Sequence, residues 1–485
     1  MSYQTAIASM FALGHELAQT PSHKFDLAHM RVLLAAMDHP ERDFPSVLIA
    51  GTNGKGSTAA TLASILRASG LKTALYTSPH LIRINERIRV NNEEIADDDF
   101  ARLHGEVDRI AERLVAQRAL PWHPSFFEMM TAIAFAHFAR QHVEIAVLEV
   151  GMGGRLDATN VVEPLVSVIA DISLDHQKFL GDTVGEIARE KVGIIRPGGT
   201  VVTLPQQPEA NDVIGNTILD LGARGVSAVQ YVPPVSPGSA SYLVPNRKDE
   251  KLLTAENAEE GGETCSLRLL YRYPLQVMGK QILVETPLVG RHQLRNVALA
   301  IATTEELSKL PAVEPRTPSP AVSPTTTQKF SSITPHSIER GIRETHWPGR
   351  FQVVDQAGWP EIVLDVAHNP AGAWALRSAL SERYGDRPLI FVFGAMRDKA
   401  ISEMTEILFP LADRVIATRV ENPRSASQEE IQLAGSRAGT EIEAVADVGV
   451  ALERARESSG PNTAIVVTGS IYLVGEAMRV LRVKA

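Results

Sequence analysis

The sequence predicts an α/β fold, in which a P-loop-containing, doubly wound parallel-sheet domain is followed by a smaller Rossmann-like α/β domain. Three observations lead to this prediction. Short apolar runs without polar alternation are separated by segments of helical spacing, which is typical of parallel strands covered on both faces. A glycine-rich loop, 51–57, lies between the first apolar run and a helical segment. A second series of apolar runs begins near Phe351.

The first domain is expected to alternate strands and helices from residue 46 onwards. Ser46–Ala50 (SVLIA) is a short apolar run, and Thr58–Ser69 has the apolar spacing of a helix that Gly70 would end. Alternating strands and helices favour right-handed crossovers within one parallel sheet. The further runs expected to be strands are 72–76, 145–150, 166–171 and 200–204.

The second domain is expected to have the same texture on a smaller scale. Helical stretches such as 372–384 and 473–483 lie between and after its apolar runs. The sequence therefore predicts a central domain of residues 1–345 and a C-terminal domain of residues 346–485. The runs expected to be buried strands here are 362–367, 388–394, 414–418 and 464–469.

Two stretches have the composition of insertions. Residues 246–263 are charged and rich in glutamate, and residues 311–335 contain six prolines among serines and threonines. Such segments have little apolar surface to bury, so we expect mobile loops or linkers at both places.

Composition excludes several classes of protein. The chain has 485 residues, of which 44% are hydrophobic and 22% are charged, as in ordinary globular proteins. It has neither a long apolar run nor a basic leader, so we expect no membrane span, no secretory signal and a cytoplasmic location. The single cysteine, Cys265, excludes an internal disulfide framework and a Cys-based zinc site. A net charge of −9 argues against general nucleic-acid binding.

The loop Gly51–Ser57 (GTNGKGS) is expected to bind phosphate. Glycines let backbone N–H groups converge on phosphate oxygens, and the following helix adds the positive end of its dipole. Lys55 would reach the outer phosphates. The loop departs from the usual G-x-x-x-x-G-K-[ST] pattern, because Gly56 follows Lys55 and Ile49 stands in place of the first glycine. The alternative is a tight turn with an exposed lysine.

Nine sequence motifs, in order, carry a resemblance to a known family. They are GTNGKGS, YTSPHLIRINERI, LEVGMGGRLDATN, SLDHQKFLG, REKVGIIRPG, RHQLRNVALA, HWPGRFQ, DVAHNPAG and VTGSIYLVGE. Together they resemble folylpolyglutamate synthase and dihydrofolate synthase of the Mur ligase superfamily, over nearly the whole chain outside the two insertions. The resemblance implies a C-terminal domain of the glutamate-ligase type. It also implies ATP binding by Thr52, Asn53, Gly54, Lys55, Gly56 and Ser57.

Polar side chains follow three of the expected strands. Ser78 follows the strand 72–76, Glu149 ends the strand 145–150, and His176 follows the strand 166–171. Ligands of open α/β sheets bind at this edge, and oxygen-rich ligation suits Mg²⁺. In the family that the chain resembles, the matching serine, glutamate and histidine bind magnesium. The alternatives are a Ser-Pro turn, a carboxylate in a salt bridge and a core histidine.

Lys191 lies in the segment Glu190–Gly193, which is expected to be helical. A solvated lysine is the ordinary reading. The resemblance implies that this lysine is carbamylated and helps to hold a second Mg²⁺, because carbamylation turns a cation into an anionic oxygen ligand. It also implies that Lys55, Lys191 and His176 are the catalytic residues.

Two segments resemble the pterin-binding parts of the family. One begins a helix that runs through Phe138, and its first residues also form a capping-box pattern that would give them a structural role alone. The other follows the Gly-rich loop, where an arginine could pair with a substrate carboxylate and Asp157 could equally cap a helix. Residues 24–26 (KFD) resemble a third such segment more loosely. The candidate folate-binding residues are Ser125, Phe126, Phe127, Glu128, Arg155, Leu156, Asp157 and Ala158.

The second half of the nucleotide site follows from the resemblance. Asn296, Arg350 and Asp365 match residues that contact ATP in the family, and the last two come from the side of the second domain. Assembly of such a site would need domain closure, which excludes water from a reactive intermediate. Without the resemblance, the same residues would be a helix cap, a junction arginine in a salt bridge and a turn aspartate.

These features and the resemblance together predict an ATP-dependent ligase that adds L-glutamate through an acyl phosphate; the substrate expected is tetrahydrofolate and also dihydropteroate, but the sequence does not decide between one activity and both. We expect ATP and two Mg²⁺ ions as cofactors, a monomer, and neither nucleic acid nor membrane as partner. A Mur-type ligase acting on another carboxylate is the nearer rival, but 50 residues before the loop are too few for its UDP-binding domain. A P-loop switch protein would need a guanine-reading N-K-x-D motif, which the sequence lacks.

Overall fold

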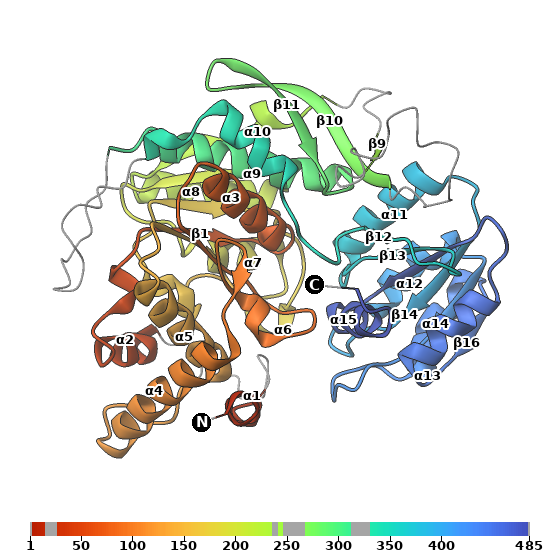
Figure 1. Cartoon of the computed structure of the whole chain (residues 1–485), viewed down its shortest axis with the longest axis horizontal. Coiled ribbons are helices and arrows are strands. Elements are labelled where there is room, and N and C mark those ends of the chain that lie inside the picture. Colours follow the sequence, from red (N-terminus) through yellow and green to blue (C-terminus); the bar gives the residue numbers. More distant parts are fainter. Residues whose placement is uncertain (1, 15–26, 235–240, 246–266, 312–329, 484–485) are drawn as a thin grey trace, which may run out of the picture. The chain divides into compact units, whose positions relative to one another are not determined.

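A computed structural model describes residues 2–14, 27–234, 241–245, 267–311 and 330–483, and it divides into two compact units (Figure 1). Unit 1 holds Met1–Val232, Gln276–Ile282 and Arg295–Ile342. Unit 2 holds Pro233–Leu275, Leu283–Leu294 and Arg343–Ala485. The predicted functional boundary between residues 345 and 346 stays a prediction.

Unit 1 is built on an eight-stranded sheet with the order β4-β3-β2-β5-β1-β6-β7-β8. The six strands from β2 to β8 in this order are parallel; five of them were predicted from the sequence, and β8 was not. Since parallel strands end at one edge, their following loops share that edge. The bounds are β1 Ser46–Ala50, β2 Thr73–Tyr76, β3 Ile88–Val90, β4 Glu93–Glu94, β5 Ile145–Glu149, β6 Val166–Ile169, β7 Thr200–Thr203 and β8 Arg224–Ser227.

Two strands at one edge of this sheet run against the others. β3 pairs antiparallel with β2, and β4 pairs antiparallel with β3. The sequence analysis did not predict them, because strands of three and two residues are too short to show a periodicity.

The helices of unit 1 connect and cover the strands. α3 packs on β2 and β5, and it begins at Lys55 rather than at the predicted Thr58. The loop's last three residues therefore already belong to the helix. The bounds are α1 Tyr3–Ala12, α2 Leu27–Ala35, α3 Lys55–Ala68, α4 Asp97–Ala116, α5 Phe126–Arg140, α6 Gln177–Leu180, α7 Val184–Val192, α8 Pro208–Asp220, α9 Arg291–Ser308 and α10 Pro335–Arg343.

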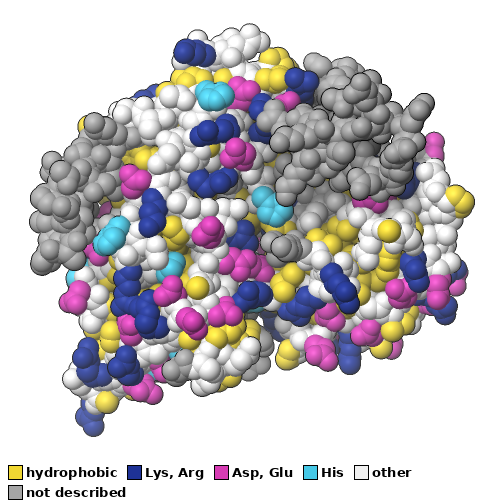
Figure 2. All heavy atoms as spheres, in the orientation of Figure 1, with side chains coloured by type: hydrophobic (Ala, Val, Ile, Leu, Met, Phe, Trp, Pro, Cys, Tyr) yellow, Lys and Arg dark blue, Asp and Glu magenta, His cyan; other side chains and the backbone are white. Residues whose placement is uncertain are grey.

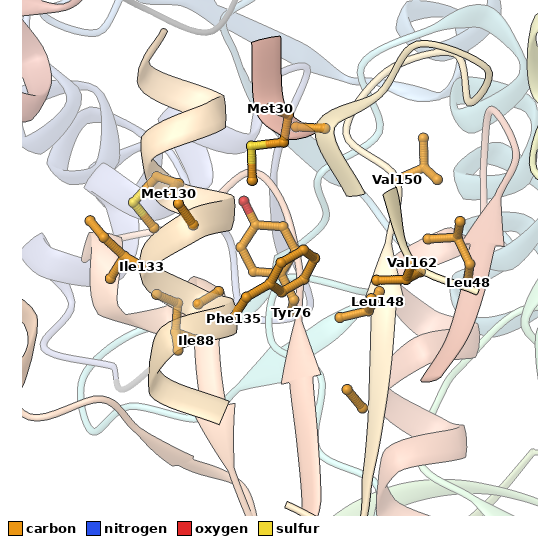
Figure 3. Close-up of a cluster of buried hydrophobic side chains, with 14 of the residues drawn as sticks. Met30, Leu48, Tyr76, Ile88, Met130, Ile133, Phe135, Leu148, Val150 and Val162 are labelled. Carbon is orange, nitrogen blue, oxygen red and sulfur yellow. The ribbon is translucent and has the colours of Figure 1, made fainter. Parts of the chain in front are cut away.

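The core of unit 1 lies between α5 and the sheet. Figure 3 shows Met130, Ile133 and Phe135 of α5 beside Tyr76 of β2 and Leu148 of β5. All five side chains are fully buried or nearly so. Burial of each such side chain stabilises the fold by roughly 1.5–3 kcal/mol, so the strand ends are anchored to a rigid layer.

Unit 2 contains a six-stranded sheet with the order β12-β13-β17-β14-β15-β16. Five strands are parallel, of which four were predicted; the parallel strand β16 and the antiparallel edge strand β12 were not predicted. Its elements are β12 Gln352–Val354, β13 Glu361–Leu364, α11 Pro370–Tyr384, β14 Leu389–Phe393, α12 Ile401–Leu408, β15 Arg414–Ala417, α13 Gln428–Gly435, β16 Ile442–Ala444, α14 Val448–Glu457, β17 Ala464–Thr468 and α15 Ile471–Val480.

A separate three-stranded antiparallel sheet, β11-β10-β9, was also missed. Its strands are β9 Ser241–Pro245, β10 Leu267–Val277 and β11 Lys280–Thr286. Met278 and Gly279, with φ of 50° and 74°, form the two-residue turn between β10 and β11. Positive φ at both positions is the geometry that matches the twist of paired strands, so this dipeptide between alternating residues was the signal to look for.

The first predicted insertion, 246–263, lies outside the described residues, as do Cys265 and residues 24–26. The second, 311–335, is described only at its ends. There Phe330 is buried and Pro335 begins α10, so the last residues of this stretch belong to the folded chain and not to a mobile loop.

The surface carries charges of both signs. Figure 2 shows Lys and Arg interspersed with Asp and Glu over the face in view, without a field of one sign. Among the described residues, no helix is long and apolar enough to cross a membrane.

Candidate functional site

The predicted phosphate loop joins β1 to α3 and is shaped by two glycines. Gly51 has a φ of +155°, and a Cβ there would lie 2.8 Å from the Cβ of Ala170. Gly54 has a φ of +82°, and a Cβ there would lie 2.2 Å from Oδ1 of Asn296. Both conditions require glycine. The structure therefore brings Asn296 of α9 against the loop, as the predicted nucleotide site needs.

Lys55 begins α3, and its ammonium group stays near the loop. Its Nζ donates a hydrogen bond to the carbonyl oxygen of Thr52 at 3.2 Å. The first N–H groups of α3 have no acceptor within the helix, and they carry the positive end of its dipole. Cation and amides together form a site suited to phosphate.

Lys191 of α7 also contacts this loop. Its side chain is buried, with 3% of the residue exposed, and its Nζ donates to the carbonyl oxygen of Gly51 at 2.8 Å. Burial, with a smaller contribution from the charge of Lys55, lowers the pKa of Lys191 to about 7. The alternative of an ordinary solvated lysine is therefore excluded, and this amine is partly neutral near pH 7.

The three predicted metal ligands lie at or after the carboxyl ends of their strands. Glu149 is the last residue of β5, is 5% exposed, and accepts a hydrogen bond from the backbone N–H of Ser78 at 3.2 Å. His176 precedes α6 with a φ of 52°, and its Nε2 lies 3.8 Å from Oδ2 of Asp175. In the described part of the chain, no three His, Cys, Asp or Glu side chains are grouped closely enough to hold a metal ion by themselves.

The first predicted folate segment has the structural role that its pattern allowed. Ser125 and Glu128 form a capping box at the start of α5, in which Oε2 of Glu128 accepts from the Ser125 N–H at 2.8 Å and from its hydroxyl at 2.7 Å. Oε1 of Glu128 pairs with Nδ1 of His29 at 2.9 Å. Both carboxylate oxygens of Glu128 are thus engaged within the protein.

The two phenylalanines of this segment face different neighbours. The guanidinium of Arg87 lies 5.3 Å from the ring centre of Phe126. Phe127 lies against the Gly-rich loop after β5, because a Cβ on Gly151 would come within 2.5 Å of its ring. Phe127 therefore needs a glycine opposite it, and the two segments predicted to bind folate are adjacent through this contact.

The second folate segment is partly structural as well. Asp157 caps a short 3-10 helix, Ala158–Val161, by accepting from the N–H of Thr159 at 3.0 Å, and burial raises its pKa. Arg155 is exposed, and its guanidinium pairs with Glu190 at 2.9 Å. Leu156 is half-buried and Ala158 is buried beside them.

Arg350 and Asp365 belong to unit 2, whereas the phosphate loop and Asn296 belong to unit 1. Asp365 accepts hydrogen bonds from the N–H groups of Phe351 at 2.8 Å and Ala367 at 2.9 Å, and burial raises its pKa. The Arg350 guanidinium lies 5.9 Å from the ring centre of Trp347. Their assignment to the nucleotide stays a prediction.

Two buried residues that support the candidate site were not predicted from the sequence. His29 is buried beside Glu128, and Arg87, which is 2% exposed, donates from Nε to Nδ1 of His80 at 2.9 Å. Arg87 lies in the motif YTSPHLIRINERI, but nothing in that motif shows that an arginine is buried. A charged residue is expected to be exposed unless its partners are known.

Comparisons with known proteins find relatives over almost the full chain. Residues 349–471 match the family model described as the Mur ligase glutamate ligase domain. The chain is 31% identical to dihydrofolate synthase/folylpolyglutamate synthase of Bacillus subtilis, over 94% of this chain and 95% of that protein. It is 32% identical to folylpolyglutamate synthase of Lacticaseibacillus casei, over 99% of both.

Solved structures agree with these relatives. Folylpolyglutamate synthase of Mycobacterium tuberculosis complexed with ADP superposes with a TM-score of 0.78 at 27% identity, over 99% of both chains. A structure described as an FPGS-AMPPCP-folate complex superposes with a TM-score of 0.73 at 29% identity, over 99% of this chain and 100% of that one.

Proposed function

The chain belongs to the folylpolyglutamate and dihydrofolate synthase family of the Mur ligases and is an ATP-dependent ligase, and from this premise we propose that it joins L-glutamate both to tetrahydrofolate and to dihydropteroate. The observation that carries the proposal is the convergence of Lys55 and Lys191 on the loop between β1 and α3. The ammonium of Lys55 and the first amides of α3 together suit the phosphates of a nucleoside triphosphate, and Lys191 contacts the same loop.

The reaction proceeds in two transfers. The substrate carboxylate attacks the γ-phosphorus of ATP, which forms the acyl phosphate and releases ADP. The amine of L-glutamate then attacks the acyl carbon, loses a proton and releases inorganic phosphate. The loop amides and Lys55 hold the phosphates in line and offset the charge of the transferred group, which is most of what phosphoryl transfer requires of a protein.

Magnesium is proposed as the cation of this site, and the residues present fit it. Glu149 supplies a buried carboxylate beside the backbone of Ser78, while the hydroxyl of Ser78 and the imidazole of His176 complete a donor set rich in oxygen. When bound, Mg²⁺ would neutralise phosphate charge.

Carbamylation of Lys191 is proposed as well. A neutral amine attacks CO₂, a C–N bond forms and one proton is released, which leaves an anionic carbamate. The buried position of Lys191 and its pKa of about 7 support this chemistry, because the neutral form is available at physiological pH. The carbamate would supply oxygen ligands for a second magnesium ion.

For folate we propose the region around Phe127 and the loop that it touches. An aromatic ring offers a stacking surface for a flat heterocycle. The guanidinium of Arg155 is exposed enough to exchange Glu190 for a substrate carboxylate. Ser125, Glu128 and Asp157 are engaged in capping hydrogen bonds. We therefore propose that these three residues set the shape of the folate-binding region.

A direct assay tests the function. Release of ADP is measured with L-glutamate and either dihydropteroate or tetrahydrofolate, with each substrate omitted in turn. We expect glutamate-dependent ADP release with both. Release with one alone would restrict the activity to that substrate, and release with neither would contradict the proposal. We also propose that the protein is a monomer and acts in the cytoplasm. The mass of the protein in solution tests whether it is a monomer.

A further inference from the structure

The backbone of the phosphate loop is bound to the segment that follows β6. The N–H groups of Thr52 and Asn53 both donate to the carbonyl oxygen of Asp171, at 2.6 Å and 3.2 Å. Asn53 and Asp171 form an isolated antiparallel bridge. Two loops that leave a parallel sheet are thus paired with each other beyond the strand ends.

Side chains close the same contact a second time. The hydroxyl of Thr52 donates to the carbonyl oxygen of Ser173 at 2.9 Å and accepts from the N–H of Ser173 at 3.1 Å. The side-chain amide of Asn53 donates to Oγ of Ser173 at 3.0 Å. Ser173 is 8% exposed, so these bonds are shielded from water and lose little to competition with it.

The segment after β6 is also held from its other side. The side chain of Gln206, which follows β7, accepts from the N–H of Ile172 and donates to the carbonyl oxygen of Ala170, each at 3.1 Å. The guanidinium of Arg295 donates to the carbonyl oxygen of Pro205 at 2.8 Å. Residues 170–173 therefore lie between two anchored loops and have little freedom to shift.

This arrangement decides which amides remain for phosphate. The N–H groups of Thr52 and Asn53 are used by Asp171. The amides at the start of α3 have no acceptor within the helix. Thr52 and Asn53 therefore act on the nucleotide by holding the loop open in the conformation that Gly51 and Gly54 require, which removes the cost of ordering it on binding.

We propose that Ser173 and Gln206 are positioning residues for the nucleotide, which hold the phosphate loop in its binding conformation through residues 170–173. The inference rests on the proposed function, since it assumes that ATP binds at this loop. Ser173 is bonded directly to Thr52 and Asn53 of the loop, whereas Gln206 acts on the loop through residues 170–172. His176 lies three residues after Ser173, so the same segment also helps to set the position of the His176 imidazole.

The test is the affinity for ADP, measured by calorimetry without folate, for Ser173→Ala and Gln206→Ala. Each variant removes one or two hydrogen bonds that hold the segment, so we expect the Kd for ADP to rise about three- to tenfold. In turnover, the KM for ATP should rise similarly while the KM for glutamate and kcat change less than twofold.

Matched controls separate positioning from lost stability. Ser64→Ala removes a buried hydroxyl that donates to the carbonyl oxygen of Gly341 at 2.7 Å, and Gln432→Ala removes an amide that donates to Ile442 at 2.8 Å. Both should lower the melting temperature as the test variants do but leave the Kd for ADP unchanged.

The possible results are distinct. If Ser173→Ala and Gln206→Ala bind ADP as tightly as the wild type, or if the controls weaken binding equally, the positioning role is wrong while the proposed function stands. If the wild-type chain itself binds no ADP, the proposed function fails and the inference fails with it.

Discussion

The carboxyl ends of the two parallel sheets differ in how their polar residues are paired. At the unit 1 sheet, Thr52 and Ser173 are hydrogen-bonded across two loops, and Lys191 is bound to Gly51. At the unit 2 sheet, the fully buried hydroxyls of Thr418 and Thr468 lie at or just after strand ends without a hydrogen-bond partner among the described residues.

If ATP binds at the loop between β1 and α3, as proposed, the difference means that this edge is organised before the ligand binds. A buried polar group without a partner costs free energy, whereas a hydrogen-bonded network is rigid. In unit 1, the loop between β1 and α3 is bonded to the segment after β6, although the buried hydroxyl of Thr58, one residue after the loop, has no hydrogen-bond partner among the described residues. In unit 2, Asp365 is satisfied by two backbone amides, but the neighbouring strand ends are less completely paired. Substitutions should therefore affect nucleotide chemistry most strongly in unit 1.

The largest effect is expected for Lys55→Ala. The variant removes the ammonium that offsets charge on the transferred phosphoryl group, so turnover should fall roughly 10²–10⁴-fold. ADP release is the measurement, with circular dichroism to show that the variant is folded. Near-normal turnover in a folded variant would contradict the view that nucleotide chemistry depends most strongly on the sheet edge of unit 1.

Lys191 should come next. If its carbamate is needed, Lys191→Ala loses about 10²-fold in turnover, and Lys191→Arg fails as badly, because arginine keeps the positive charge but supplies no anionic ligand. Turnover is compared with and without added bicarbonate. A fully active Lys191→Arg enzyme would reject the carbamate and leave a simple cation.

Glu149→Gln tests the same edge of the unit 1 sheet by removing a proposed magnesium ligand. The amide keeps the shape of the side chain but loses its charge, so the Mg²⁺ concentration for half-maximal turnover should rise about tenfold or more, as expected when one charged ligand is lost. Equal Mg²⁺ curves for variant and wild type would exclude Glu149 as a ligand.

The stability of unit 1 should depend on pH through Lys191. Its folded pKa of about 7 lies below its unfolded value of 10.5, so the folded state binds fewer protons between these values and stability rises with pH there. In CO₂-free buffer, the stability of Lys191→Met relative to the wild type should thus be greater at pH 6 than at pH 10, by about 4 kcal/mol for a shift of this size. Denaturant unfolding at both pH values gives the difference, and a constant difference would contradict the low pKa.

The smallest effect is expected from the same substitution made at both sheet edges. Thr468→Val replaces an unpaired buried hydroxyl by a methyl group of similar shape. The free energy of unfolding should therefore rise by about 1 kcal/mol or less. Thr52→Val breaks two hydrogen bonds and should destabilise instead. Thermal unfolding of the pair measures this contrast, and equal shifts would show that the two edges do not differ.

Much of the fold could be predicted from local pattern. Unpatterned apolar runs such as 145–150 gave strands of the parallel sheets, and the Gly-rich loop fell between β1 and α3 as expected. Those features depend on residues near one another in the chain. The edge strands β3 and β12 and the hairpin of β10 and β11 were missed, because short or half-exposed strands are defined by their partners rather than by their own composition.

The candidate site divides in the same way. Motif order alone pointed to Lys55, Glu149 and Lys191, and to the family to which the chain belongs. The sequence could not show that Lys191 is buried against Gly51, 140 residues away, or that Glu128 is paired with His29, 99 residues away.

By itself, then, the sequence determined the alternation of strands and helices, the glycine-rich loop between β1 and α3, and the kind of reaction. The tertiary structure alone decided which side chains meet: Ser173 with Thr52 across 121 residues, and Gln206 with the segment after β6. The physical reason is that hydrogen-bond partners and burial are set by the packing of distant segments. Pattern along the chain reports periodicity and propensity, but it carries no record of which loops lie side by side once the sheet has formed.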